Sequence, residues 1–267
     1  MDDRAHDHDH DHTAVLEAYG ARLAVSAPDD TVLDSIVAGL PRGWSRNHVI
    51  NKHDEIQWRF GVRRSGTGYL VRDGDGLERQ CAELDLAIVM LRTQMRRFVG
   101  YHAKDLVFVH AGVVAQEGAA IVLPGHSFAG KSTLVEALVG AGAEFYSDEY
   151  AMFDAQGRVA HYREPLSRRG ASGLEEVELG SGEPLEPVRV GLVAFTSYRP
   201  GARWEPRRLS TGAGLVAMME HAVPARERPA QTLATLRQAL TGAALLGGER
   251  GEAVETARAL IGALRAR

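Results

Sequence analysis

Residues 119–133 combine an apolar run, a glycine-bounded loop and a lysine–serine pair. Gly125 to Ser132 fits the pattern G-x-x-x-x-G-K-[ST], in which a loop connects a strand to a helix. The apolar residues 121–123 predict the short buried strand, and the residues from Ser132 onward have helical spacing. Glycines allow successive N–H groups to turn inward, and a helix N-terminus adds partial positive charge. The segment therefore predicts a site for nucleotide phosphates.

The residue types of this loop also indicate what each group binds. Lys131 is expected to neutralise the β- and γ-phosphates, and Ser132 to offer its hydroxyl to Mg²⁺, so ATP and Mg²⁺ are the expected cofactors. Phe128 is bulky for such a loop, and an ordinary glycine-rich turn before a helix is the alternative interpretation. The complete expected phosphate-binding segment is Gly125, His126, Ser127, Phe128, Ala129, Gly130, Lys131, Ser132 and Thr133.

Two acids, Asp148 and Glu149, follow a short apolar stretch, seventeen and eighteen residues after Lys131. A right-handed strand–helix–strand crossover places the second strand beside the first, with its carboxyl end at the edge of the loop. There one carboxylate can hold the metal and another can accept a proton from a hydroxyl nucleophile. Because neighbouring residues of a strand face opposite ways, both can act only if the strand ends or bends. A solvated acidic turn is the alternative.

Composition limits the classes of protein and partner. Apolar residues make up 45% of the 267 residues, enough for a sizeable core, and the net charge of −4 gives no basic field for nucleic acid. No stretch approaches the roughly 20 apolar residues of a membrane span, and no signal peptide is recognisable. The single cysteine, Cys81, excludes an internal disulfide. We expect a cytoplasmic protein without nucleic-acid or membrane partners; a homo-oligomer stays open.

The chain is expected to have three parts. Residues 1–13 alternate His with Asp and predict a disordered tail, with a Ni²⁺- or Zn²⁺-binding tract as the alternative. Residues 14–100 predict a small α+β unit, and residues 101–267 a phosphate-loop core with C-terminal helices. The elements expected in the small unit are strands at 19–26, 56–63 and 69–72 and helices at 31–40 and 83–101.

The core is expected to surround the phosphate-loop strand with further strands. Residues 105–115 predict strands interrupted near Gly112, forming a hairpin with the strand that feeds the loop. The remaining expected elements are a hairpin at 151–159, a basic loop at 161–169, a mobile excursion at 170–187, a strand at 188–198, a β-like connection near 204–209, and packing helices at 229–246 and 251–265.

Three stretches of this core, 109–114, 125–134 and 145–149, resemble the HPr kinase/phosphorylase family. They are most similar to its shorter, kinase-only relatives, such as the lasso-peptide precursor kinases. The resemblance is clear over residues 105–160 and loose to residue 210. It implies an α/β phosphate-loop core with a mixed sheet, distantly similar to phosphoenolpyruvate carboxykinases and preceded here by the small α+β unit.

The resemblance also implies roles for single residues. His110 corresponds to the family's active-site histidine, Lys131 to its phosphate-binding lysine and Ser132 to its Mg²⁺-binding serine. Asp148 and Glu149 correspond to its paired aspartates, of which the second accepts the proton of the substrate serine. The implied catalytic residues are therefore His110, Lys131, Asp148 and Glu149, and the implied metal ligands are Ser132 and Asp148.

Three departures from the family pattern narrow what can be carried over. Phe128 stands where a mid-loop glycine is usual, and Glu149 is one methylene longer than the second aspartate. The loop that carries a further metal-binding acid and the phosphorylase signature is not recognisable, although Glu175 and Glu176 lie nearby. Neither the reverse phosphorylase reaction nor HPr as the substrate can therefore be assumed.

Together these features predict an ATP- and Mg²⁺-dependent kinase acting on a hydroxyl, with serine of a protein or peptide as the expected acceptor. A small-molecule hydroxyl, in a sugar or natural-product intermediate, is one alternative. A non-catalytic module that senses nucleotide is the other, and the acidic pair argues against it.

Overall fold

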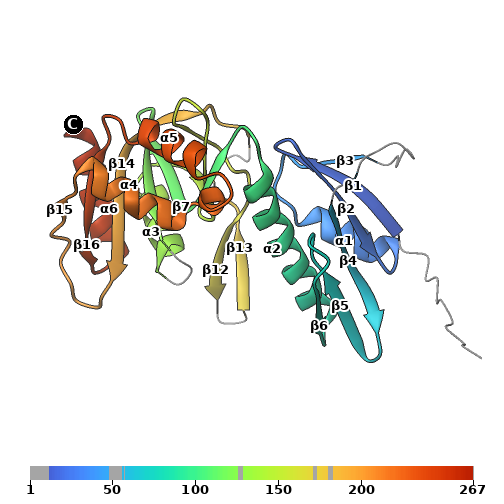
Figure 1. Cartoon of the computed structure of the whole chain (residues 1–267). Helices are drawn as coiled ribbons and strands as arrows, with labels where there is room; N and C mark the ends of the chain where they lie inside the picture. The colour runs from blue at the N-terminus through green and yellow to red at the C-terminus, as the bar shows by residue number, and fades with distance from the viewer. Residues whose placement is uncertain are drawn as a thin grey trace, which may run out of the picture. The chain divides into compact units, whose positions relative to one another are not determined.

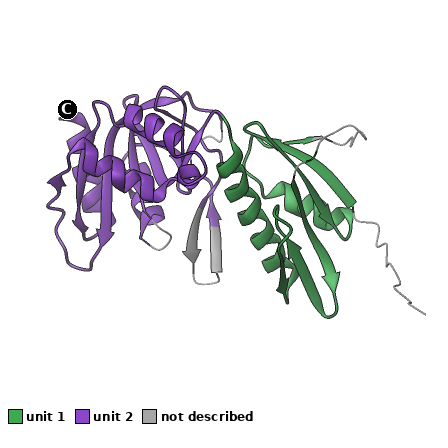
Figure 2. Ribbon diagram, in the orientation of Figure 1, with its two compact units in different colours: residues 1–104 green, residues 105–267 purple. Residues whose placement is uncertain are grey.

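The computed structural model describes residues 12–47, 56, 58–125, 129–170, 173–179 and 183–266. The chain divides into two compact units, Met1–Lys104 and Asp105–Arg267 (Figure 2). The boundary predicted from the sequence lies four residues earlier, after residue 100. Residues 1–11 of the expected tail lie outside the described residues, whereas His12 and Thr13 belong to a strand. Each unit has hydrophobic clusters of its own.

Unit 1 is a six-stranded mixed sheet of order β3-β1-β2-β4-β5-β6, against which two helices pack (Figure 1). The predicted helices and strands are present in it, and β1, β3 and β6 are additional. The first predicted strand starts later than expected, because Tyr19 and Gly20 take positive φ angles of 51° and 79° in a turn. The elements are β1 His12–Ala18, β2 Ala21–Ala27, α1 Asp30–Ala38, β3 Ser45–Asn47, β4 Trp58–Ser65, β5 Gly68–Arg72, β6 Glu78–Cys81 and α2 Leu84–His102.

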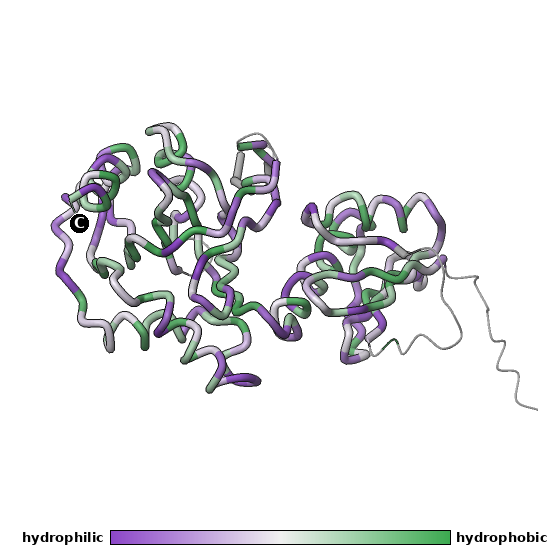
Figure 3. The backbone as a smooth tube through the Cα atoms, turned by 90° about the horizontal axis from the view of Figure 1, so that it is seen from above, coloured by the Kyte–Doolittle hydropathy of each residue, from purple (hydrophilic) through white to green (hydrophobic). Residues whose placement is uncertain are grey.

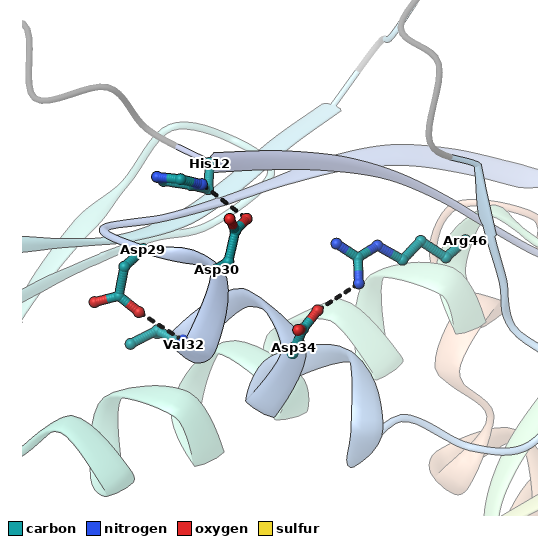
Figure 4. Close-up of polar contacts among 6 residues, drawn as sticks. All are labelled: His12, Asp29, Asp30, Val32, Asp34 and Arg46. Atoms are coloured by element: carbon teal, nitrogen blue, oxygen red, sulfur yellow. Dashed lines mark hydrogen bonds and ion pairs between the residues drawn. The ribbon is translucent and has the colours of Figure 1, made fainter.

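Polar contacts at the surface of unit 1 fix the start of α1 (Figure 4). The Asp29 carboxylate accepts a hydrogen bond of 2.9 Å from the Val32 N–H, which caps the helix and stabilises it by about 1 kcal/mol. Two exposed ion pairs connect α1 to neighbouring strands and contribute little, since each is open to solvent. They are His12 Nδ1–Asp30 Oδ1 at 2.7 Å and Arg46 Nη1–Asp34 Oδ1 at 2.6 Å.

Unit 2 is built on an eight-stranded mixed sheet of order β11-β10-β7-β8-β14-β16-β15, in which β9 also pairs with β7. A separate hairpin is formed by β12 and β13. The elements are β7 Val107–Gln116, β8 Ala119–Pro124, α3 Lys131–Gly140, β9 Glu144–Ser147, β10 Tyr150–Phe153, β11 Arg158–Ala160, β12 Leu166–Gly170, β13 Gly173–Val177, β14 Val188–Tyr198, β15 Arg207–Arg208, α4 Thr211–His221, a 3₁₀ turn Val223–Ala225, α5 Pro229–Ala239, β16 Ala244–Arg250 and α6 Ala253–Arg265.

The central strands of unit 2 are buried on both faces. Side chains alternate along a strand, so Val122 joins the cluster beneath α4 and α5, whereas Ile121 and Leu123 join the cluster beneath α3 and α6. Val113 and Val114 of β7 alternate in the same way. The result is a helix–sheet–helix arrangement with the parallel strands β8, β14 and β16 at its centre (Figure 1).

No helix in the described ranges is long and apolar enough to cross a membrane. Figure 3 shows the hydrophobic residues in short stretches that alternate with hydrophilic ones through both units. Cys81 is a buried free thiol.

The predicted interruption at Gly112 is wrong, because β7 runs unbroken from Val107 to Gln116. Glycine is required at this position for packing, because a Cβ there would lie 2.6 Å from a methyl carbon of Val135. Without a side chain at position 112, α3 can pack closely on β7. The predicted hairpin of β7 with β8 is confirmed.

The predicted placement of the acid-bearing strand directly beside the loop strand is also wrong. β7 lies between them: β8 pairs antiparallel with one edge of β7, and β9 with the other. Both strands oppose β7, so they run in the same direction. Their carboxyl ends therefore reach the same edge of the sheet, as the prediction required, by a different route.

The segment predicted as a basic loop and a mobile excursion contains the hairpin β12–β13 instead. Its register pairs Leu166 with Val177 and Gly170 with Gly173. Leu166 is fully buried in the cluster beneath α3 and α6, which anchors the hairpin to the core. The many Gly and Glu residues concealed this pairing in the sequence.

The long helix predicted at 229–246 is wrong beyond Ala239. The chain turns at Gly242, which has a φ of 76°, and continues as β16. Leu245 and Leu246 of β16 pair in parallel with Val193 and Ala194 of β14, so burial in the sheet overrides their helical propensity. Helix α4 was not predicted at all.

Candidate functional site

The candidate site lies at the carboxyl edge of β8, where the chain leaves the sheet and enters α3. The Gly125 N–H donates to the His110 carbonyl oxygen at 3.3 Å, which fixes the start of the loop against β7. α3 begins at Lys131, directly after the loop. His126, Ser127 and Phe128 lie outside the described residues, so the structure bears on the two ends of the predicted phosphate loop.

The two pattern glycines differ in why glycine is required. Gly130 has a φ of 76°, the left-handed region in which a side chain is strained. Gly125 does not take such an angle, and a Cβ on it would make ordinary contacts of 3.5 Å with Ala129 and Lys131. A backbone conformation that requires glycine was expected at both positions. It is found at Gly130 and not at Gly125.

The acid pair occupies a bend between β9 and β10, both of which run along the same edge of β7. The Ser147 Oγ accepts hydrogen bonds from the N–H groups of Glu149 at 3.1 Å and Tyr150 at 3.0 Å. The Glu149 carbonyl accepts from the Ala111 N–H at 3.2 Å, which returns the chain to the sheet. The strand therefore bends where the prediction required it, and two consecutive acids are freed from strict alternation.

Ser132 and Asp148 meet directly. The Ser132 Oγ donates to Asp148 Oδ2 at 3.0 Å, joining the first turn of α3 to the end of β9. Asp148 is only 8% exposed, so its carboxylate is held in a largely dehydrated position. The hydroxyl and the carboxylate predicted to share a metal thus lie within hydrogen-bond distance of each other.

Lys131 carries the positive charge of the site. Its burial lowers the pKa of the ammonium group from its usual 10.5, while the nearby carboxylates of Glu149 and Asp148 oppose that change by favouring the charged form. The half-buried ammonium group is therefore within electrostatic reach of both acids. The lysine, the serine and the acid pair, predicted from separate stretches of sequence, converge on one place.

The side chain of His110, in β7, lies near that of Glu149, in the bend just before β10. His110 Nδ1 lies 3.8 Å from Glu149 Oε1, within ion-pair range but beyond a normal hydrogen bond, and both side chains are nearly half exposed. The His110 ring also packs at 4.7 Å on the ring of Tyr150, its cross-strand neighbour. The histidine is thus held beside the acid but open to an incoming group.

The donor set fits Mg²⁺ bound together with phosphates. Mg²⁺ prefers oxygen ligands and is usually held by one or two protein groups, with phosphate oxygens and water completing its octahedron. Ser132 Oγ and Asp148 Oδ2 are two such oxygens. Across the described ranges no group of three or more His, Cys, Asp and Glu side chains could hold a metal by itself.

Other expected residues contribute less. Thr133 is exposed on α3, and Ala129 is half-buried beside the loop. Glu176 is exposed on β13, and the side chain of Glu175 lies outside the described residues. Neither of these two glutamates is placed with Asp148 by any contact that the structure describes.

Sequence reasoning missed Arg250, which lies at the carboxyl end of β16 and donates to the Gly130 carbonyl. The parallel strands β8, β14 and β16 bring their carboxyl ends to one edge, and Arg250 is the last residue of its strand. The apolar pair Leu245–Leu246 is the sequence signal for β16, but the same pair also fits the end of the helix predicted at 229–246.

Comparison with known proteins finds only distant likeness. No protein-family model matches the chain, and no curated protein matches it significantly. Among solved structures, the chain is similar to the HPr(Ser) kinase/phosphatase from Coxiella burnetii, with 12% sequence identity and a TM-score of 0.32 over 60% of this chain and 88% of that chain.

Proposed function

We propose that this protein is an ATP- and Mg²⁺-dependent phosphotransferase that phosphorylates a hydroxyl group, with serine of a protein or peptide as the acceptor. One observation supports this most strongly: the Ser132 hydroxyl, in the first turn of α3, and the buried Asp148 carboxylate, in the bend after β9, meet at 3.0 Å. Beside them stand a lysine and a second, accessible acid. That combination is typical of phosphoryl transfer from a nucleoside triphosphate.

Each side chain has a role in the proposed reaction. Lys131 and the N–H groups of the loop neutralise and orient the β- and γ-phosphates. Ser132 and Asp148 hold Mg²⁺, which when bound neutralises charge on the phosphate oxygens. Glu149, oriented by the neighbouring His110, is the general base.

The proposed step is a direct displacement. The acceptor hydroxyl oxygen attacks the γ-phosphorus, the bond from that phosphorus to the β–γ bridging oxygen breaks, and ADP leaves. The proton of the hydroxyl passes to the Glu149 carboxylate. The half exposure of this carboxylate supports the assignment, because an acceptor must reach it from solvent.

The test is ATP consumption measured with and without candidate acceptors: serine-containing peptides on one arm, and sugars and other small alcohols on the other. We expect ADP release to rise with peptide and the peptide to gain one phosphoryl group. Lys131→Ala should abolish transfer, whereas Lys104→Ala, an exposed lysine outside the site, should leave it unchanged. Turnover with a small alcohol alone would make the protein a small-molecule kinase. ATP binding without transfer to any acceptor would favour a nucleotide-sensing module.

A further inference from the structure

A guanidinium group is buried directly against the last glycine of the phosphate loop. Arg250 is 2% exposed, and its Nη2 donates to the Gly130 carbonyl oxygen at 2.8 Å. The residue comes from β16, 120 positions further along the chain. We propose that Arg250 is a positioning residue that sets the orientation of the loop's final peptide and thereby the affinity for nucleotide phosphates. This inference rests on the proposed function.

Arg250 is held without a hydrogen-bonded carboxylate. Its Nη1 donates to the Gly251 carbonyl at 2.9 Å, and the guanidinium lies 5.2 Å from the centre of the Tyr198 ring. Its Nε is buried and has no hydrogen-bond partner among the described residues. The nearby Glu252 accepts a hydrogen bond from the Tyr198 hydroxyl at 3.3 Å instead. A buried charge without a hydrogen-bonded counter-ion destabilises the folded state. We therefore infer that Arg250 has a function that outweighs this cost.

The Gly130 carbonyl shows what that role is. The oxygen accepts two hydrogen bonds, one from Arg250 and one of 3.2 Å from the Leu134 N–H, the first bond of α3. Because the peptide group is planar and trans, fixing this carbonyl also fixes the N–H of Lys131 on the opposite side. That N–H therefore points away from the Gly130 carbonyl and out of the N-terminal end of α3, where an anion would sit.

The same contact explains the second glycine of the pattern. A Cβ on Gly130 would lie 2.5 Å from Arg250 Nη2, closer than atoms tolerate, and the positive φ independently disfavours a side chain. The guanidinium thus fills the space that a side chain would need. Its charge also adds to the positive potential of the loop, which burial makes stronger than it would be in water.

Three variants of the full chain test the inference, with ATP affinity and steady-state kinetics as readouts. Arg250→Met removes the charge and the hydrogen bonds but keeps much of the volume. Arg250→Lys keeps the charge but replaces the planar guanidinium, which donates from two nitrogens, with a single ammonium nitrogen. Arg207→Met, at an exposed arginine of β15, is the matched control. We expect KM for ATP to rise at least tenfold in Arg250→Met and several-fold in Arg250→Lys, with kcat within about threefold of wild type.

A structural role predicts a different result. Destabilisation alone lowers the fraction of active protein, so it reduces apparent kcat and leaves KM unchanged. Wild-type affinity in Arg250→Met, a lower kcat at constant KM, or loss of the folded state in both Arg250 variants would overturn the inference. Failure of the wild-type protein itself to bind ATP would instead overturn the proposed function, so the two outcomes are distinguishable.

Discussion

Asp148 and Glu149 are neighbours in sequence but occupy different environments. Asp148 is almost completely buried and accepts a hydrogen bond from Ser132, whereas the Glu149 side chain is 47% exposed and faces His110. Two adjacent carboxylates with different solvation can take different roles, one binding a cation and the other exchanging a proton with an incoming group. The proposed division of work between metal ligand and base follows from this contrast.

Glu149→Gln tests the base. The amide keeps the size and much of the polarity of the side chain but cannot accept the hydroxyl proton, so kcat should fall by about 10²–10⁴ while ATP affinity changes little. Asp148→Asn is the informative comparison, since it should weaken Mg²⁺-dependent ATP binding as well. Calorimetric titration measures the ATP affinity of each variant, and initial rates with the same acceptor measure its kcat. Normal turnover by Glu149→Gln would show that the base has been assigned wrongly.

At the scale of elements, the site depends on one bend. The strand along β7 is broken into β9 and β10 by the turn at 148–149, which the Ser147 hydroxyl stabilises by accepting two backbone hydrogen bonds. Ser147 is 2% exposed, so water cannot easily replace its oxygen. The orientation of the Asp148 and Glu149 side chains is therefore set by this turn and not by the pleat of the strands.

Ser147→Ala should therefore affect both stability and catalysis. Two N–H groups, that of Tyr150 buried and that of Glu149 part-buried, lose their acceptor at a cost of about 1–3 kcal/mol. The loss of these bonds from the turn should lower kcat at least tenfold. Ser210→Ala is the control, because the Ser210 hydroxyl likewise accepts a backbone N–H, at 3.2 Å, but caps α4. It should reduce stability by about 1 kcal/mol without changing kcat. Equal kcat values for Ser147→Ala and Ser210→Ala would show that the turn at 148–149 does not contribute to catalysis.

We expect the segment after β11 to make the stability of the folded chain depend on pH. Burial, with a smaller contribution from Arg163, lowers the pKa of His161 from 6.5 to about 4, and its neutral Nδ1 accepts a hydrogen bond of 3.2 Å from the Leu185 N–H. The folded chain keeps this ring neutral below pH 6.5, whereas the unfolded chain protonates it. Unfolding therefore takes up a proton, and stability falls as the pH is lowered from about 6.5 towards 4.

His161→Gln removes that titration. Urea unfolding at pH 7 and pH 4.5 should show a loss of about 1–3 kcal/mol in the wild type that is absent from the variant, after the losses common to both are subtracted. The same decline in both proteins would mean that other groups cause the acid sensitivity. Activity at pH 7 should be similar in the two proteins, since His161 lies outside the proposed machinery.

At the scale of the whole molecule, the hydrophobic clusters of the two units contain no common residue. The cluster of unit 1 draws on residues 14–99, and those of unit 2 on residues 107–264. Every residue of the proposed site belongs to unit 2. The proposed nucleotide site is therefore built entirely from unit 2.

Phe60→Ala tests this separation. Phe60 is 2% exposed and packs its ring on Phe98 at 5.2 Å, so truncation should cost about 3–5 kcal/mol in unit 1. Hydrogen exchange should show lost protection within residues 12–104 while ATP affinity is retained. The equivalent change in unit 2, Phe153→Ala, should lower protection there and the ATP-binding fraction as well. A fall in ATP affinity caused by Phe60→Ala would show that the two units depend on each other.

The sequence by itself determined the local parts of the site. The strand before the loop, the helix after it and the acid pair at the end of a short strand are readable from the period and spacing of neighbouring residues. Three of the six strands of unit 1 and the hairpins at 107–124 and 150–160 follow from the same signals. These features are local, because each depends on residues within about one element of each other.

Only the tertiary structure decided how those parts meet. β7 lies between the loop strand and the acid-bearing strand, and residues 244–250 form a strand that brings Arg250 to Gly130. Both depend on pairing between segments far apart in the chain, and an apolar run such as Leu245–Leu246 suits a helix or a buried strand equally well. Whether such a run forms a helix or a strand depends on the strand with which it can pair. The sequence of a single segment does not identify that partner strand.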